Sequence, residues 1–324
     1  MNIIKKYIKP IGYLISIFFL YLMFKDTNFS LVIENLQFIN PYYIVLALIL
    51  NIGFFSIRGL YQINNIYYIK RDIKFITSIG SMGILYFYNS IFPARLGEVL
   101  RAMFLSKREG INKASIFSYI FIEKILDLLV ILVLLSLIVI YRFEDAKLTH
   151  VLEISLTIVV FLIAGLFIYI QFNEKILSLL KKYVSNKIYE QIFNLNLSVI
   201  EGFRCFRTSK QIIIGMFLLM VGWTIVMGIY WLISYPYVLL LGLPNYSCLF
   251  FMVFSALSLT IPSAPAGIGV VHYGLFWAVK LLSNNIESQI NLVVAFVVML
   301  HFSMMVVDLL TCGSVLLYYK IYNK

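Results

Sequence analysis

The stretch that decides the fold is residues 75–101, FITSIGSMGILYFYNSIFPARLGEVLR, in which an apolar run ends at a proline and is followed by basic residues. A second stretch, residues 247–276, reads SCLFFMVFSALSLTIPSAPAGIGVVHYGLF and likewise runs from an apolar segment into a proline-containing motif, although it contains no Lys or Arg. Both apolar runs, 75–92 and 247–264, are short for a membrane span, which needs about 20 residues. Proline and glycine interrupt helices. The two stretches therefore predict helices that break within a membrane.

The composition of the rest of the chain agrees with a membrane location. Of its 324 residues, 62% are hydrophobic and 13% are charged, whereas soluble domains are about 45–50% apolar and about 25% charged. These values exclude a soluble globular enzyme and a disordered chain. Three cysteines lie far apart and in no metal-binding spacing, at Cys205, Cys248 and Cys312. We therefore expect no disulfide framework, no metal site and no cofactor.

Hydropathy predicts six full transmembrane helices and two shorter runs. The full spans are expected at 8–24, 42–60, 115–141, 151–172, 211–235 and 290–319. The first of them follows lysines but precedes no cleavage site, which predicts a retained signal-anchor. Segment 174–210, which is rich in lysine, is expected to be an amphipathic cytoplasmic helix.

The basic residues predict the orientation, because Lys and Arg are enriched in cytoplasmic loops. Most of the 26 Lys and Arg residues fall at the two termini and in segments 58–74, 93–113 and 173–210. If the two short runs crossed the membrane, segment 93–113 would lie outside. If both are re-entrant, these segments all lie on one side. We therefore expect an all-α polytopic protein with two opposed re-entrant hairpins, in a bacterial or archaeal inner membrane, with both termini cytoplasmic. The net charge of +11 then needs no nucleic-acid partner.

The two proline motifs align with each other at a fixed offset. PARLGEV at 93–99 matches PAGIGVV at 265–271. We interpret residues 1–324 as one membrane domain with inverted repeats at about 42–141 and 211–319, joined by 151–210. An alternative is a generic turn that matches by chance in an apolar chain. The residues expected to break the hairpins are Pro93, Gly97, Pro262, Pro265, Gly267 and Gly269.

Ionisable residues within spans are costly and are candidates for function. Glu123 and Asp127 are four positions apart on one helix face, with Lys124 beside them. The first hairpin adds Arg95, Glu98 and Arg101 at a similar depth. We expect this set to bind substrate, because arginines hold phosphate in bidentate fashion. The alternative is a structural ion-pair network in which Arg95 and Arg101 pair with Glu123 and Asp127.

A second group of titratable residues follows the second motif. His272 comes directly after it, and His301 and Asp308 lie seven residues apart in the last span. We treat the three as candidates for proton coupling. The alternatives are that His301 is a hydrogen-bonded core residue and that Asp308 reaches water. No catalytic residue is predicted, because no nucleophile or metal cage accompanies the carboxylates.

Three elements resemble the lysylphosphatidylglycerol synthase transmembrane region, a flippase-like membrane family. NSIFPARLGEVLR at 89–101 resembles its N-x-x-x-P-x-R-x-G-E-x-x-R signature, and EKILD at 123–127 resembles its E-[RK]-x-x-D element. IPSAPAGIG at 261–269 is similar to its P-x-x-P-G-G-x-G element, with Ala266 where Gly is common. The chain also departs from the family at His272, which stands near a position where many relatives carry Glu.

The resemblance implies a lipid translocase without the soluble aminoacyl-transfer domain of the full synthases. We expect it to move an anionic phospholipid or a polyprenyl-phosphate-linked lipid between leaflets, with membrane lipids as its partners. One alternative is an intramembrane lipid-modifying enzyme that uses Glu123 and Asp127. Another is a non-catalytic membrane partner of a separate synthase or glycosyltransferase.

Overall fold

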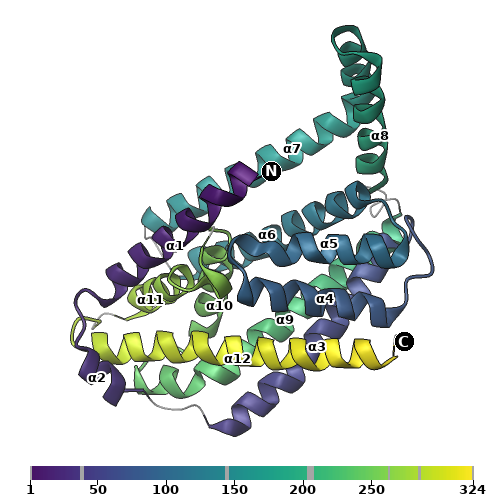
Figure 1. Cartoon of the computed structure of the whole chain (residues 1–324). Coiled ribbons are helices and arrows are strands. Elements are labelled where there is room, and N and C mark those ends of the chain that lie inside the picture. Colours follow the sequence, from purple (N-terminus) through teal and green to yellow (C-terminus); the bar gives the residue numbers. More distant parts are fainter. Residues whose placement is uncertain are drawn as a thin grey trace. The chain divides into compact units, whose positions relative to one another are not determined.

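The computed structural model describes residues 2–36, 40–142, 146–202, 208–261, 263–283 and 286–322. Every regular element in these ranges is a helix, and no strand is found among them (Figure 1). The elements are α1 (Asn2–Phe24), α2 (Phe29–Glu34), α3 (Pro41–Ile66), α4 (Phe75–Ile91), η1 (Pro93–Arg95), α5 (Leu96–Glu109), α6 (Lys113–Arg142), α7 (Ala146–Tyr183), α8 (Asn186–Gly202), α9 (Ser209–Leu240), α10 (Ser247–Ser258), η3 (Pro265–Gly267), α11 (Val270–Leu282) and α12 (Ile290–Tyr322). The predicted all-α class is confirmed.

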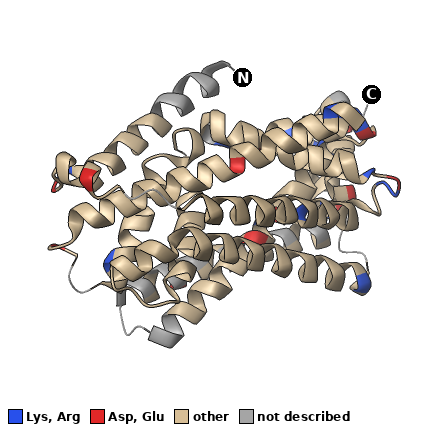
Figure 2. Cartoon of the chain, turned by 90° about the horizontal axis from the view of Figure 1, so that it is seen from below, with Lys and Arg blue, Asp and Glu red and all other residues tan. Residues whose placement is uncertain are grey.

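Several helices are built for a lipid environment. In the described part of the chain, α3, α9, α12 and the segment Pro265–Leu282 are long and apolar enough to cross a membrane. Long stretches of helix in Figure 2 carry no charged residue. Large apolar side chains are exposed on these and other helices, among them Leu14 and Ile17 on α1 and Phe161 on α7. Such exposure is unfavourable in water but not in lipid, so the chain is an integral membrane protein.

A further helix follows each of the two proline motifs. Helix α5 follows the first motif, and α11 follows the second. Helix α7 contains no proline but bends by 63° between Leu156–Tyr169 and Gln171–Tyr183, close to the boundary between the predicted span 151–172 and the predicted amphipathic segment 174–210. The arrangement of six full spans and two re-entrant hairpins therefore stays a prediction.

The chain divides into two compact units, which are described separately. Unit 1 comprises Met1–Leu60, Phe75–Arg101 and Leu218–Lys324, and unit 2 comprises Tyr61–Lys74 and Ala102–Phe217. The predicted single domain and the repeat boundaries stay predictions.

Close packing of α4 against α12 forms the centre of unit 1 (Figure 1). A Cβ atom added to Gly80 would lie 2.7 Å from Cδ2 of Tyr319, and one added to Gly83 would lie 3.1 Å from Cγ1 of Val315. Small residues allow membrane helices to approach closely in this way. Apolar side chains from α3, α4 and α12 fill the interior beside this contact, namely Phe55, Ile79, Met82, Leu85, Cys312 and Val315.

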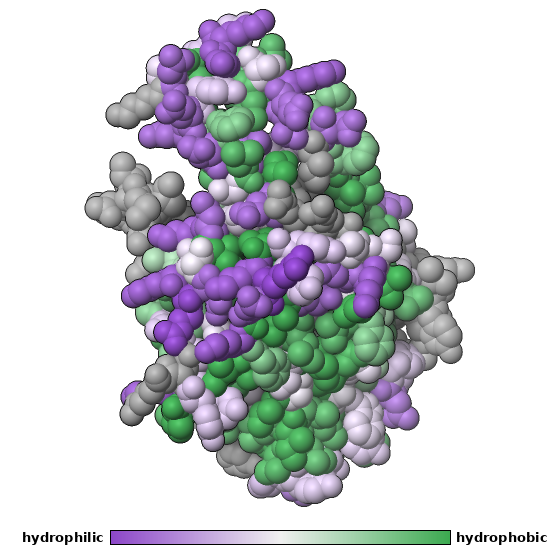
Figure 3. All heavy atoms as spheres, turned by 90° about the vertical axis from the view of Figure 1, so that its right-hand side faces the viewer, coloured by the Kyte–Doolittle hydropathy of each residue, from purple (hydrophilic) through white to green (hydrophobic). Residues whose placement is uncertain are grey.

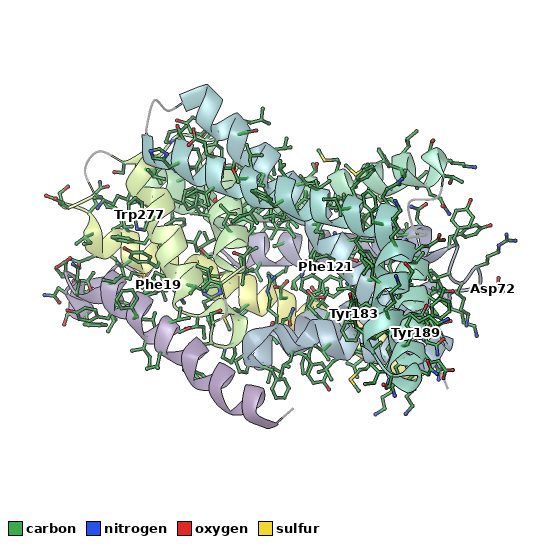
Figure 4. The ribbon with its side chains drawn as sticks, turned by 90° about the horizontal axis from the view of Figure 1, so that it is seen from above. Phe19, Asp72, Phe121, Tyr183, Tyr189 and Trp277 are labelled. Atoms are coloured by element: carbon green, nitrogen blue, oxygen red, sulfur yellow. The ribbon has the colours of Figure 1, made fainter. Side chains whose placement is uncertain are left out.

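Unit 2 is organised around α6, which contacts α7 and α8. Ser115 on α6 donates a hydrogen bond of 2.7 Å to the carboxylate of Glu201 on α8. Tyr183 and Tyr189 lie on either side of the α7–α8 turn (Figure 4). Hydrophilic side chains gather at the tip of this hairpin with hydrophobic ones between them (upper part of Figure 3). The amphipathic cytoplasmic helix expected for segment 174–210 stays a prediction.

Candidate functional site

Both proline motifs interrupt helices within unit 1. At the first, α4 ends at Ile91 and η1 leads into α5, with Arg95 in the left-handed region at φ +53°. At the second, α10 ends at Ser258, and Ala266 has φ +56° before α11 begins. The 3₁₀ turns η1 and η3 contact each other. Two helix breaks that are distant in sequence therefore meet, and non-glycine residues with positive φ cluster at functional sites in general.

The first break is closed by contacts within its own hairpin. The backbone N–H of Gly97 donates a hydrogen bond of 2.9 Å to Oδ1 of Asn89. A Cβ atom on Gly97 would lie 2.1 Å from the backbone oxygen of Leu85. Only glycine fits at this position, and Asn89 satisfies an amide that the break releases. Pro93 begins η1, where its missing N–H costs no hydrogen bond.

The second break is closed by α1. The backbone N–H of Ala264 donates a hydrogen bond of 2.9 Å to Oγ of Ser16. A Cβ atom on Gly269 would lie 2.4 Å from the backbone oxygen of Ser16, and Gly269 has φ +90°. Phe19, one turn along α1, lies against Tyr273 of α11 with ring centroids 5.1 Å apart (Figure 4). Pro265 and Gly267 form the two ends of η3, and Pro262 lies outside the described residues.

Two histidines span the second break. The backbone N–H of Gly269 donates to Nδ1 of His272 at 3.2 Å. Nε2 of His272 lies 3.4 Å from Nδ1 of His301, and Nε2 of His301 lies 3.1 Å from the backbone oxygen of Ala266. The prediction that His301 is a candidate for coupling and the alternative that it is a hydrogen-bonded buried residue are thus compatible.

A cavity of about 160 Å³ lies where the two breaks meet. Side chains and backbone from both hairpins line it, together with α9 and α12. Its polar side chains include Asn89, Ser90, Arg95, Ser263, His301 and Asp308. A polar cavity of this size can hold several water molecules, because one needs only about 10–15 Å³.

The two charged side chains at the cavity differ in their partners, because Asp308 is hydrogen-bonded and Arg95 has no carboxylate beside it in the part of the chain that the structure describes. The Asp308 carboxylate accepts a hydrogen bond of 3.0 Å from Nδ2 of Asn51, which also donates to Thr311 at 3.1 Å. Among the residues that the structure describes, no carboxylate lies within ion-pair distance of the exposed Arg95 guanidinium. A cation between apolar helices is costly without a counter-ion. Arg95 is therefore available for an anion.

The other predicted substrate-binding residues lie on α5 and α6. Arg101 is fully buried on α5, and Glu98 is partly buried one turn before it. On α6, Lys124 forms ion pairs of 3.9 Å with Glu123 and 3.8 Å with Asp127. The structure thus brings Glu123, Lys124 and Asp127 together in unit 2.

Glu123 is also held by its own helix. It is fully buried and accepts a hydrogen bond from the Tyr119 hydroxyl. A charge-assisted bond of this kind stabilises a buried carboxylate. The predicted pairing of Arg95 and Arg101 with Glu123 and Asp127 joins the two units and stays a prediction.

The sequence did not point to Ser16 or Asn51, although both contact the breaks or the cavity lining. Each is a polar residue inside an apolar helix, which is a weak signal for a buried hydrogen bond. In the described residues, no group of three His, Cys, Asp or Glu side chains is arranged to hold a metal ion.

Comparison with known proteins adds a family and two relatives. Residues 10–311 match the family described as "Lysylphosphatidylglycerol synthase TM region". The UPF0104 membrane protein MJ1078 of Methanocaldococcus jannaschii is 25% identical over 224 residues, which are 67% of this chain and 89% of that protein. The UPF0104 membrane protein MJ1595 of the same organism is 31% identical over 185 residues, which are 53% of this chain and 54% of that protein. No solved structure gives a significant match.

Proposed function

The chain belongs to the lysylphosphatidylglycerol synthase TM region family, and from this premise we propose that it moves an anionic lipid between membrane leaflets. The lipid is a phospholipid or a polyprenyl-phosphate-linked lipid, and its phosphate binds at the cavity where η1 meets η3. The membrane in question is the inner membrane of a bacterium or archaeon, with both termini in the cytoplasm.

The observation that carries this proposal is the Arg95 guanidinium. It lines the cavity from a left-handed backbone position and has no carboxylate partner among the described residues. Arginine binds phosphate through two parallel N–H donors, which is a strong and geometrically specific contact. An arginine that lines a cavity without a carboxylate partner favours binding of an anionic headgroup over a purely structural ion pair.

The helix breaks support a transport role. Non-helical backbone between membrane helices is tolerated where it is buried in protein or lines a water-filled cavity. Broken helices of this kind form the substrate sites of many transporters. Here one break comes from each of the two motifs, so a headgroup in the cavity contacts both hairpins.

The test uses purified protein in liposomes that contain a fluorescent anionic phospholipid, with an impermeant quencher that reports its leaflet. We expect the wild type to exchange the lipid between leaflets faster than empty liposomes do. Arg95→Ala should slow this exchange by about 10–100-fold, because a hydrogen bond to a charged group contributes about 1.5–3 kcal/mol. Arg95→Lys should exchange lipid at a rate between those of Arg95→Ala and the wild type, since lysine keeps the positive charge but lacks the two parallel N–H donors of the guanidinium.

The matched control is Arg71→Ala, which removes an exposed arginine in unit 2 whose guanidinium lies over the Tyr67 ring. Its exchange rate should equal that of the wild type. Equal exchange rates for Arg95→Ala and the wild type would show that Arg95 does not bind the lipid phosphate. A wild type no faster than empty liposomes would overturn the proposed function.

A further inference from the structure

We propose that the His272–His301 pair is a proton-binding site that couples lipid movement to the proton gradient by opening the second helix break. This inference rests on the proposed function and deepens it by naming the coupling ion. It starts from the chain of contacts that runs from Gly269 through both rings to Ala266.

Two backbone groups determine where the protons of this pair sit. The Gly269 N–H can only donate, so the Nδ1 of His272 that it contacts accepts and carries no proton. The Ala266 carbonyl can only accept, so Nε2 of His301 carries a proton. Neutral His272 then has its proton on Nε2 and donates to Nδ1 of His301. The two neutral rings therefore satisfy all three contacts with one proton each.

One further proton cannot be added without breaking a contact. If it binds Nδ1 of His272, it faces the Gly269 N–H, and two donors then oppose each other. If it binds Nδ1 of His301, it either opposes the Nε2–H of His272 or moves the His272 proton to Nδ1, again opposite Gly269. In each case one N–H bond forms, and at least one of the three hydrogen bonds that link Gly269, the two rings and Ala266 is lost.

The lost contacts are those that hold the break closed. Gly269 and Ala266 both have positive φ, at +90° and +56°, and both lie shortly before the start of α11. His301 tethers this segment to α12, and the rings meet edge to face with centroids 4.5 Å apart. Protonation therefore releases α11 from α12 at the wall of the substrate cavity.

The surroundings of the pair place it next to the substrate site. His301 lines the same cavity as the Arg95 guanidinium and the Asp308 carboxylate. In their described side chains, α1 and α10, which also pack against α11, carry no Asp, Glu, Lys, Arg or His. The other charged or titratable residues that line the cavity are Tyr86 from α4, Arg95 from η1, Tyr230 from α9 and Asp308 from α12. A bound lipid phosphate near Arg95 would favour a positive charge on the histidine pair.

The first experiment determines which imidazole nitrogen of each histidine carries a proton, and it does not depend on a transport assay. The chain has three histidines, so the protein labelled with ¹⁵N-histidine in nanodiscs should give three imidazole spin systems. His150, which is exposed on α7, serves as the internal reference. We expect His272 and His301 to be neutral Nε2–H tautomers in the absence of lipid substrate. An Nδ1–H tautomer on either ring would overturn the proposed chain of hydrogen bonds from Gly269 through the two rings to Ala266.

The second experiment applies a pH gradient to the proteoliposomes of the leaflet assay. One proton per lipid predicts a tenfold change in the leaflet ratio for one pH unit, since one unit corresponds to 1.36 kcal/mol. The change should reverse when the gradient is reversed. His272→Gln and His301→Gln should give the same leaflet ratio with and without the gradient, and His150→Gln should behave as the wild type.

The outcomes separate the two proposals. A wild type that moves lipid identically with and without the gradient overturns the coupling and leaves the proposed function standing. A wild type that moves no lipid overturns both. Gradient responses that persist in His272→Gln and His301→Gln place the proton site elsewhere.

Discussion

Gly97→Ala is the most direct test of how the first helix break is closed. The glycine lies in the first turn of α5, where a Cβ atom would be 2.1 Å from the backbone oxygen of Leu85 and 2.6 Å from Oδ1 of Asn89. A backbone oxygen cannot rotate away as a side chain can. The added methyl group must therefore push α5 and α4 apart and stretch the hydrogen bond from Gly97 to Asn89.

The size of the effect follows from opposing contributions. Ordinary van der Waals contact begins near 3.4 Å, and forcing extra atoms into a packed interior costs about 1–3 kcal/mol. Loss of the hydrogen bond from Gly97 to Asn89 adds about 1 kcal/mol. Alanine gains up to about 1 kcal/mol over glycine in helix propensity. We therefore expect the free energy of unfolding to fall by about 2 kcal/mol.

The matched control is Gly313→Ala, in α12 of the same unit. A Cβ atom there has no atom within 4 Å, so only the propensity gain remains and stability should stay equal or rise by up to about 1 kcal/mol. The assay is unfolding in detergent micelles by titration with sodium dodecyl sulfate, followed by the fluorescence of the three tryptophans. If Gly97→Ala and Gly313→Ala unfold at the same concentration of sodium dodecyl sulfate, α5 does not approach α4 as closely as described.

Two further predictions concern the second hairpin. Ser16→Ala should lower the free energy of unfolding by about 1–3 kcal/mol in the same titration, because it leaves the buried N–H of Ala264 unpaired; an unchanged midpoint would contradict the contact between α1 and the break. Gly274→Ala should also destabilise, since its Cβ atom would lie 2.0 Å from Oγ of Ser258. Adding Ser258→Ala should recover part of that loss, and strictly additive effects would show that the two positions do not touch.

Local chemistry made the helix breaks predictable from the sequence. Pro93 and Pro265 remove a backbone donor, and Gly97 and Gly269 permit close approach or positive φ. These properties belong to single residues, so they can be read without knowing the fold. The same holds for the apolar helices, because a run of about 20 apolar residues predicts a span wherever it occurs.

The partners of the breaks could not be predicted in this way. Asn89 is eight residues from Gly97, but Ser16 is 248 residues from Ala264. Nothing in the apolar run around Ser16 indicates which backbone amide it accepts from.

The joining of α1 to the second break also constrains the order in which the protein can be assembled. Ser16 is synthesised first, and its two contacts, with Ala264 and Gly269, arrive only after most of the chain has been made. The contacts that close the second break, which borders the cavity, therefore form only late in synthesis.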